Sequence, residues 1–146
     1  VDVTIDGSTA TTVTVPGTLS TPAITSLNAS VTALNAAVAD SGWVSCTLNS
    51  PTWTEWTGQS GPPMVRKIGP KVYTRGFVQR VAGSPAADEL ICTVPAGYRP
   101  SAQIHLITTA NTADSTVGIQ SNGSFVWKSG STATWLSMDM MYWFVG

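Results

Sequence analysis

An apolar seam near the start of the chain constrains the fold more than any other feature. Its five residues recur at spacings of 3, 4, 3 and 4, and they are Ile24, Leu27, Val31, Leu34 and Val38. This is the heptad pattern of a coiled coil, in which helices bury narrow apolar stripes against one another. We therefore expect a neck helix over residues 22–41 that packs against identical copies of itself.

The rest of this segment supports a helix that is stable only in an assembly. It consists mostly of Ala, Ser, Thr and Asn, and it carries no charge before Asp40. Such a helix has modest intrinsic propensity and should be marginal when isolated in water. Thr21 is a suitable N-cap, Pro22 suits the first helical position, and Gly42 suits a left-handed C-terminal stop.

The charge content of the chain excludes some classes of function. Charged residues make up only 10% of the 146 residues, and the formal net charge is −1. There is no basic stripe of the kind that binds nucleic acid, and no polybasic cluster for a membrane surface. The apolar runs are also too short to span a bilayer. We expect neither a nucleic-acid partner nor membrane insertion.

The sequence divides into three segments. Residues 1–21 alternate apolar and polar side chains, and we expect the end of a preceding β element followed by a connector. The neck helix over 22–41 comes next, and residues 42–146 form a β-rich head. Because the chain begins with Val1 rather than Met, we expect a fragment of a longer polypeptide or a processed product. The sequence leaves open whether residues 1–21 exchange strands between subunits.

The head is predicted to consist of short strands separated by turns rich in Gly, Pro, Asn and Ser. Asn122-Gly123 between two alternating segments is the strongest hairpin signal. Eight or nine short strands at this spacing predict a mainly β fold, a jelly roll or a β-sandwich. The predicted strands are Trp43–Leu48, Met64–Ile68, Val72–Val81, Glu89–Val94, Gln103–Thr109, Thr116–Gln120, Ser124–Lys128, Thr134–Met138 and Met140–Val145.

Several motifs of the head resemble a known family. They are Gly42-Trp43, Arg66–Gly69 with Val72–Val78, Pro95–Pro100, Gly118–Gly123 and Trp135–Met138. The P-x-G-Y-R-P turn at Pro95–Pro100 is the most specific of them. Together they resemble the C-terminal head domain of phage tail fibres and receptor-binding proteins, over residues 42–146, with the short coiled coil matching the family's neck. For Pro95–Pro100 itself we expect a structural role, a shaped corner between sheets.

The resemblance implies a homotrimer whose head contacts the host surface, often a saccharide, at the tip of a tail fibre on the virion. The seam alone favours two chains, because Ile or Val at heptad position a with Leu at heptad position d is typical of two-stranded parallel coiled coils. We expect three chains, since five seam positions contribute little beside a large head interface.

The head offers little of what catalysis needs. The only histidine, His105, lies in a predicted strand, and its nearest carboxylate in sequence is Asp114, so no nucleophile triad is predicted. Glycan cleavage would need two carboxylates facing each other across a cleft. No such pair stands out among the acidic residues of the head, which are Glu55, Asp88, Glu89, Asp114 and Asp139. We expect a protein that is not an enzyme and uses no cofactor.

Metal binding is not expected either. Asn111 and Asp114 would supply only two of the oxygen ligands that Ca²⁺ requires. Cys46 and Cys92 have no second metal ligand near them in sequence. We expect two buried thiols on strands, while a disulfide between strands stays an alternative that spacing cannot decide.

Aromatic residues give the more informative functional signal. Sugars stack their C–H faces on aromatic rings, while a few polar groups fix their hydroxyls. Trp53 and Trp56 lie in a turn-rich stretch and would face opposite ways in an extended segment, so at most one is exposed. Trp127 follows the predicted hairpin. On side-chain type and position alone, the receptor-binding candidates are Trp53, Trp56, Trp127, Asn111 and Asp114.

The other aromatic residues are expected inside the assembly, because Trp is highly buried on average. Trp43 is assigned to the core or to the junction with the neck. Trp135 faces away from Leu136, Met138 and Met140 if these three form the core stripe. Residues 142–144, Tyr-Trp-Phe, are expected to fill the sandwich or a trimer axis.

The seam and the resemblance together imply a phage tail-fibre head that attaches the virion to a bacterial surface polysaccharide. Two alternatives stay open. The first is a structural trimer that only caps or registers a longer fibre. The second is a trimeric secreted adhesin that resembles a lectin.

Overall fold

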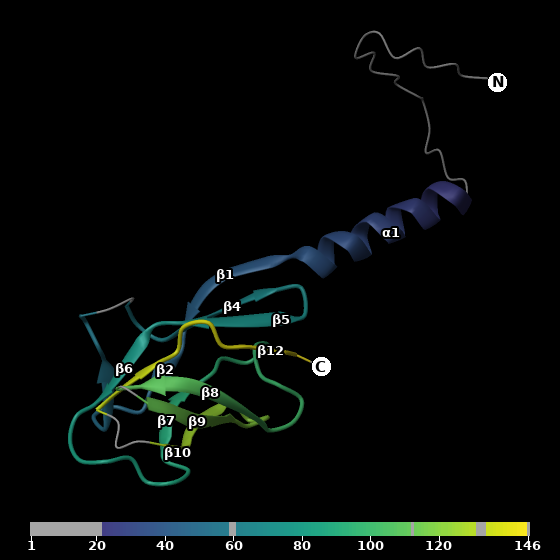
Figure 1. Ribbon diagram of the computed structural model, residues 1–146. Helices are drawn as coiled ribbons and strands as arrows, with labels where there is room; N and C mark the ends of the chain where they lie inside the picture. Colours follow the sequence, from purple (N-terminus) through teal and green to yellow (C-terminus); the bar gives the residue numbers. More distant parts are fainter. Residues whose placement is uncertain (1–21, 59–60, 112, 131–133, 146) are drawn as a thin grey trace, which may run out of the picture. The chain divides into compact units, whose positions relative to one another are not determined.

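The computed structural model describes residues 22–58, 61–111, 113–130 and 134–145, so the expectations for residues 1–21 lie outside the described residues. They contain one helix, α1 (Pro22–Val38), followed by strands (Figure 1). The strands are β1 (Asp40–Ser45), β2 (Thr47–Leu48), β3 (Trp53–Glu55), β4 (Met64–Ile68), β5 (Lys71–Arg75), β6 (Phe77–Arg80), β7 (Leu90–Thr93), β8 (Ile104–Ala110), β9 (Ala113–Ile119), β10 (Ser124–Gly130), β11 (Trp135–Ser137) and β12 (Tyr142–Phe144). The chain forms two compact units that divide between Leu34 and Asn35, and each is described by itself.

The helix begins at Pro22, as predicted, but it ends at Val38 rather than at residue 41. Asp40 already belongs to β1, and the positive φ of Gly42 (67°) accompanies a register shift in the pairing of β1 with β4. Gly42 therefore shapes a bulged strand instead of stopping the helix. None of the described helices has the length and apolarity needed to cross a membrane.

The seam of α1 is open to solvent in the single chain. Its side chains are 37% exposed at Ile24 and between 46% and 67% exposed at the other four positions. Elsewhere on the helix, the Ser30 and Thr32 hydroxyls donate hydrogen bonds to carbonyls four residues earlier, at 3.0 and 2.8 Å. Such bonding does not strengthen a helix. The chain itself does not bury the seam, and its burial against identical helices stays a prediction.

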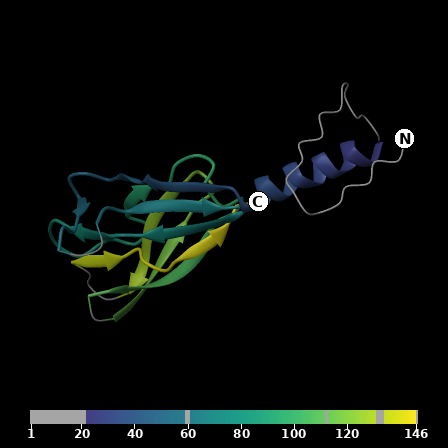
Figure 2. The ribbon, with the colours of Figure 1, turned by 90° about the horizontal axis from the view of Figure 1, so that it is seen from above.

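The strands form two antiparallel sheets, which confirms the predicted mainly β fold. The smaller sheet has the order β1-β4-β5-β12, and the larger has the order β2-β7-β10-β9-β8-β11-β6-β3. Their inner faces pack together as a β-sandwich (Figure 2). The predicted hairpin at Asn122-Gly123 is confirmed: it joins β9 to β10, with Phe125 opposite Ile119.

The chain changes sheets where the sequence predicted one uninterrupted strand over residues 72–81. The break is at Gly76, whose φ is +107° and whose N–H donates to Asp139 Oδ1 at 2.8 Å. A Cβ at this position would lie 2.2 Å from the carbonyl oxygen of Pro62. Only glycine fits both the backbone angle and the contact. The predicted strand over 43–48 is likewise split at Cys46 between the two sheets.

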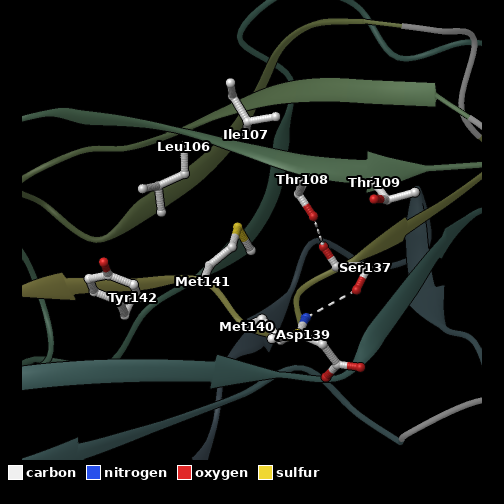
Figure 3. A pocket seen from close by; sticks show the side chains of 9 residues that line it. All are labelled: Leu106, Ile107, Thr108, Thr109, Ser137, Asp139, Met140, Met141 and Tyr142. Carbon is white, nitrogen blue, oxygen red and sulfur yellow. Dashed lines mark hydrogen bonds between the residues drawn. The ribbon is translucent and has the colours of Figure 1, made fainter.

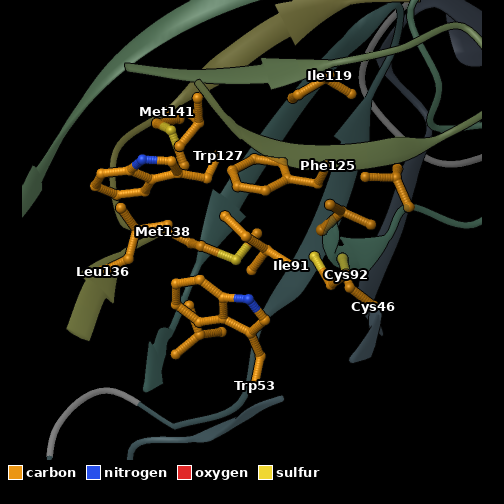
Figure 4. Close-up of a cluster of buried hydrophobic side chains, with 14 of the residues drawn as sticks. Cys46, Trp53, Ile91, Cys92, Ile119, Phe125, Trp127, Leu136, Met138 and Met141 are labelled. Carbon is orange, nitrogen blue, oxygen red and sulfur yellow. The ribbon is translucent and has the colours of Figure 1, made fainter. Parts of the chain in front are cut away.

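The core lies between the two sheets and is dominated by large side chains of the bigger one (Figure 4). Trp53, Ile91, Phe125, Leu136 and Met138 have no exposed surface. They lie on β3, β7, β10 and β11 or, for Met138, directly after β11, so several strands of the larger sheet contribute to its apolar inner face. Burial of such side chains is the main source of stability in a domain of this size.

The two cysteines lie in this core as free thiols, which confirms the first of the two expectations. Their side chains are adjacent in Figure 4. The hydrogen bond with Cys46, together with burial, raises the pKa of the Cys92 thiol. The Cys92 sulfur is therefore kept in the protonated, unreactive form.

Only one of the three C-terminal aromatic residues fills the sandwich. Trp143 is 4% exposed, and its Nε1–H donates to the carbonyl oxygen of Tyr98 at 2.8 Å. Tyr142 and Phe144 are 52% and 61% exposed, because alternation along β12 turns them to the outer face. Tyr142 and Phe144 therefore do not fill the sandwich, and the other expectation for them, a place at a trimer axis, stays a prediction.

The Pro95–Pro100 turn is a packed corner. Gly97 has a φ of +85°, and the Arg99 Nε–H donates to the carbonyl oxygen of Val94 at 3.0 Å. The Val94 N–H in turn donates to the carbonyl oxygen of Gly123 at 2.8 Å, which ties the corner to the β9–β10 hairpin. These contacts match the structural role expected for the motif.

Candidate functional site

Two of the three tryptophans selected from the sequence lie in the core. Trp53 is 0% exposed and its Nε1–H donates to Glu89 Oε1 at 2.8 Å. Trp127 is 4% exposed and shares the inner face of β10 with Phe125. Neither ring has a face open to a ligand, so the selection of Trp53 and Trp127 as receptor contacts is corrected. The physical reason is strand alternation, which turns both rings toward the opposite sheet.

The third selected tryptophan belongs to an aromatic cluster on the outer face of the larger sheet. Trp56 lies with its ring centroid 5.0 Å from that of Trp135 and 5.8 Å from that of Phe77. The centroids of Phe77 and Trp135 are 5.7 Å apart. These spacings are typical of favourable aromatic pairs. All three side chains are half-buried, and we call them the aromatic platform.

Strand register explains why these rings meet. β11 pairs with β6 so that Trp135 lies opposite Gln79 and Leu136 opposite Val78. Leu136 and Val78 are fully buried, so Trp135 and Phe77 take the outer face. β3 pairs with the other edge of β6, and the N–H of Trp56 donates to the carbonyl oxygen of Phe77 at 3.2 Å. Three strand segments far apart in sequence thus place one ring each on a common surface.

Uncharged polar side chains flank the platform. Gln79 is exposed on β6, and Thr54, its partner on β3, is half-exposed. Both lie on the same face as Phe77 by alternation. The surface therefore combines open ring area with an amide and a hydroxyl that can hydrogen-bond a ligand.

Asn111 positions the platform. Its φ is +51°, and its Oδ1 accepts hydrogen bonds from the N–H and hydroxyl of Thr134 and from the N–H of Trp135, at 3.1 to 3.3 Å. This acceptor holds the backbone that enters β11. The structure thus gives Asn111 a role in orienting Trp135, whereas the sequence selected it as a direct contact.

Asp114, the remaining selected residue, lies on the outer face of β9 opposite Thr109. It is exposed. In the strand order, β8 separates it from β11 and hence from the platform. The platform and Asp114 share one face of the larger sheet but form no common cluster.

A half-buried ion pair supports the platform from the inner side of β6. Arg80 donates from Nε and Nη2 to the two carboxylate oxygens of Glu89, at 2.8 and 2.9 Å. The hydrogen bond from Arg80 holds the pKa of Glu89 below its ordinary value, and further bonds from Ala86 and Trp53 act in the same direction against partial burial. Bidentate pairing of this kind fixes the geometry of both side chains on the inner side of β6.

A concave feature separate from the platform lies between β8 and the segment that joins β11 to β12 (Figure 3). It is an open pocket of about 560 Å³. Its lining residues are Leu106, Ile107, Thr108, Thr109, Ser137, Asp139, Met140, Met141 and Tyr142. Its polar groups largely serve the fold, since the Thr108 hydroxyl donates to the Ser137 carbonyl at 2.5 Å and the Ser137 hydroxyl accepts from the Asp139 N–H at 3.1 Å.

Neither feature contains a cluster suited to a metal. Among the residues that the structure describes, no three His, Cys, Asp or Glu side chains gather in one place. Asp139 is the one carboxylate that lines the pocket, and its Oδ1 accepts the N–H of Gly76. The polar groups of the pocket are engaged within the fold, whereas the platform has open ring area beside the exposed Gln79, so the platform is the better candidate for ligand binding.

Sequence reasoning found one ring of the platform and missed two. The signal for Trp135 was its alternation with the predicted core stripe of Leu136, Met138 and Met140. The stripe is correct for Leu136 and Met138, which are fully buried, and wrong for Met140, which is 93% exposed because the chain turns there with a φ of +66°. Phe77 carried no separate signal. Their proximity to Trp56 depends on the pairing of β11 with β6 and of β6 with β3, which local sequence does not encode.

Comparisons with known proteins bear on the fold. No protein family matches the sequence, and no curated protein matches it either. Among solved structures, the chain is similar to the receptor binding protein (gp15) of Listeria phage PSA, with a TM-score of 0.59 and 14% sequence identity. The similarity covers 85% of this chain and 76% of that one. At this identity the likeness shows the fold, so this chain has a fold like that of a phage receptor binding protein.

Proposed function

We propose that this chain is the receptor-binding head of a phage tail fibre, which attaches the virion to a saccharide on the bacterial surface. Two observations support the proposal. The fold is like that of a protein described as a phage receptor binding protein. The outer face of the larger sheet carries three aromatic rings within 5.8 Å of one another.

The aromatic platform is the feature that supports a saccharide as the ligand. A pyranose ring presents an apolar C–H face to Trp56 and Trp135, and its hydroxyls reach Gln79 or Thr54 at the edge. Such stacking does not depend on ligand charge. The low charge of the chain, with a net charge of −1, fits an uncharged ligand that needs no electrostatic steering.

The oligomer strengthens a weak site. The exposed seam of α1 supports association of identical chains, and the proposed state is a homotrimer. Three platforms on one fibre tip raise the effective concentration of each site at a repetitive polysaccharide. Sites with dissociation constants on the order of millimolar would then bind the polysaccharide with high avidity, without any additional contact.

The test is binding of the full chain to an array of purified bacterial capsular, wall and lipopolysaccharide glycans. The variants are Trp56→Ala and Trp135→Ala, with Trp43→Ala as the matched control, because Trp43 is also half-buried but lies on the smaller sheet. Removing one stacking ring costs roughly 1–3 kcal/mol by analogy with base stacking, which is about 5- to 150-fold in affinity per site.

The expected result is that the wild type binds at least one glycan, that either platform variant loses most of this binding, and that the control keeps it. Equal binding by all four proteins would refute the platform as the site. An intact oligomer that binds no glycan on such an array would instead support a purely structural capping role.

A further inference from the structure

The four strands of the smaller sheet (Figure 1) concentrate positive charge. They supply four of the seven Lys and Arg side chains of the whole sequence but only one carboxylate, that of Asp40. The four cations are Arg66, Lys67, Lys71 and Arg75. A local excess of positive charge therefore exists in a chain whose net charge is −1.

Strand register brings three of these cations and three aromatic rings to the outer face of the sheet. One row crosses all four strands, with each residue opposite the next, and it consists of Trp43, Arg66, Tyr73 and Tyr142. The row faces outward because its neighbours along the strands are at most 4% exposed, namely Val65, Val72 and Trp143. Alternation along β5 gives Lys71 and Arg75 the same face as Tyr73. We call the row, together with Lys71 and Arg75, the basic face.

Aromatic rings, rather than carboxylates, hold two of these cations. Lys71 Nζ lies 3.9 Å from the ring centroid of Tyr142 and 4.9 Å from that of Tyr73. The guanidinium carbon of Arg75 lies 4.5 Å from a ring centroid of Trp43. In the described part of the chain, neither Lys71 nor Arg75 forms an ion pair. Cation–π contacts orient the two cations and leave their charge without a counter-ion.

The third cation of the basic face is already paired. The Arg66 Nε–H donates to Asp40 Oδ1 at 2.8 Å, and its Nη2 pairs with the other carboxylate oxygen. Arg75, by contrast, has the sulfur of Met64 beside its Nη2 at 3.3 Å, and its Nε has no hydrogen-bond partner among the described residues. Lys71 and Arg75 are therefore the two cations of this face for which a ligand can supply the anion.

The arrangement of charges and rings indicates the chemistry of such a ligand. Lys71 and Arg75 are four residues apart on one strand, so their Cα atoms are separated by roughly 13 Å, with Tyr73 between them. An extended ligand with more than one negative charge suits this spacing. A sugar ring that carries a carboxylate offers an apolar C–H face to a tyrosine and an anion at its edge to a neighbouring cation. An uncharged glycan would leave both cations unpaired.

Two other occupants fit the basic face less well. Single-stranded nucleic acid also combines flat rings with negative charge, but its binding depends on many phosphate contacts, and two unpaired cations supply few of them. A second copy of this chain would bring the same positive charges to the contact if its basic face met the first, and like charges repel.

We propose that the basic face is a second binding surface, which takes a polysaccharide whose sugar rings carry carboxylates, as uronic acids do. Lys71 and Arg75 pair with carboxylates of the ligand, and Tyr73 and Tyr142 receive the face of a sugar ring. This inference goes beyond the proposed function, because the aromatic platform lies on the other sheet and takes an uncharged sugar.

The test is an NMR titration of the ¹⁵N-labelled full chain with oligosaccharides of galacturonic acid and of hyaluronan. Their methyl esters, which keep the sugar rings and remove the charge, serve as matched ligands. Lys71→Gln and Arg75→Gln each remove one cation from the basic face. Lys128→Gln is the matched control, because it removes one cation from an exposed ion pair with Asp88 outside the smaller sheet. Circular dichroism and light scattering check the fold and the molar mass of every variant.

The wild type should bind at least one acidic oligosaccharide, with saturable shifts of the backbone amides of β5 and β12, and the ester should bind at least about tenfold more weakly. Lys71→Gln and Arg75→Gln should each weaken binding about 5- to 10-fold, because a charge-assisted hydrogen bond is lost. Lys128→Gln should bind as the wild type does. Raising the ionic strength from about 0.05 to 0.5 M should weaken wild-type binding, because salt screens exposed charges.

The inference is overturned if no acidic oligosaccharide binds, if the esters bind equally well, or if Lys71→Gln and Arg75→Gln both keep the wild-type affinity. Two further results would assign the face to another occupant and overturn the inference as well. One is a single-stranded oligonucleotide that binds this face when the acidic oligosaccharides do not. The other is a changed molar mass of the folded Lys71→Gln variant, which would identify an interface between copies.

The same proteins separate this inference from the proposed function. Trp135→Ala should bind the acidic oligosaccharides as the wild type does, and Lys71→Gln should keep the binding of an uncharged glycan. Trp43→Ala stays a control for the platform when the glycan is uncharged, since such a ligand forms no ion pair on the basic face. Binding of acidic oligosaccharides alone would remove the platform and retain this inference, and binding of uncharged glycans alone would do the reverse.

Discussion

Replacing Trp53 by Ala should cost far more stability than replacing Trp135 by Ala, although both are tryptophans of the larger sheet. Trp53 has no exposed surface. Truncating a buried Trp to Ala removes its transfer free energy and leaves a cavity, which together cost about 3–5 kcal/mol. The lost indole hydrogen bond adds at most about 1 kcal/mol, because Glu89 keeps its two bonds to Arg80.

Trp135 is only half-buried, so truncating it to Ala leaves a depression open to solvent rather than an internal cavity. It loses two ring contacts, with Trp56 and Phe77, each worth about 0.5–1.5 kcal/mol. The expected cost is about 1–3 kcal/mol. Because a whole domain is stable by only about 5–15 kcal/mol, the Trp53 variant should lie near the margin of folding and the Trp135 variant should not.

The assay is urea unfolding followed by far-ultraviolet circular dichroism, which does not depend on the residues being removed. All samples are measured at one protomer concentration, because association couples stability to concentration. The difference in midpoint, multiplied by the common slope, gives the change in the free energy of unfolding. Equal losses for the two variants, or a larger loss for Trp135→Ala, would refute the assignment of one ring to the core and the other to the surface.

Three further predictions concern the interior. The hydrogen bond from Arg80 lowers the pKa of Glu89 in the folded protein. The Glu89 carboxylate therefore stabilises the fold above its ordinary pKa of 4.5, and this stabilisation is lost as pH falls through the folded-state pKa. In acid titrations of the free energy of unfolding, Glu89→Gln should reduce this pH-dependent loss. Gly76→Ala should lower the free energy of unfolding in urea by at least about 1–3 kcal/mol, because the new Cβ would clash with the Pro62 carbonyl at a φ of +107°. An unfolding midpoint equal to that of the wild type would contradict this prediction. Cys46 and Cys92 should react with a thiol reagent only after denaturation, and rapid labelling of the native protein would show that they are not buried thiols.

Periodicity predicted the local elements well and their partners poorly. The 3-and-4 spacing predicted the helix, Pro22 marked its start, and Asn122-Gly123 marked the hairpin, because each signal acts within a few residues. The sheet changes at Cys46 and Gly76 were not predicted. They depend on contacts with Pro63 and Asp139, respectively, which are remote in sequence.

The candidate site shows the same limit. Alternation indicates that Trp135 and Leu136 face opposite ways, but it does not say which residues of another strand lie beside them. Trp53 was misassigned because the turn-rich sequence around it concealed a three-residue strand whose inner face it occupies. Trp56, at the end of that strand, takes the other face. Only the pairing of β3, β6 and β11 distinguishes the buried ring from the exposed one.

The most direct test of the central claim is the indole N–H spectrum of ¹⁵N-labelled protein, with its six Trp signals assigned by single Trp→Phe variants. A glycan that binds on the array is titrated in. The account predicts that the signals of Trp56 and Trp135 shift in a saturable way, while those of Trp53 and Trp143, whose N–H groups are bonded at 2.8 Å inside the fold, stay in place. Saturable shifts confined to Trp43, or binding that moves neither Trp56 nor Trp135, would contradict it.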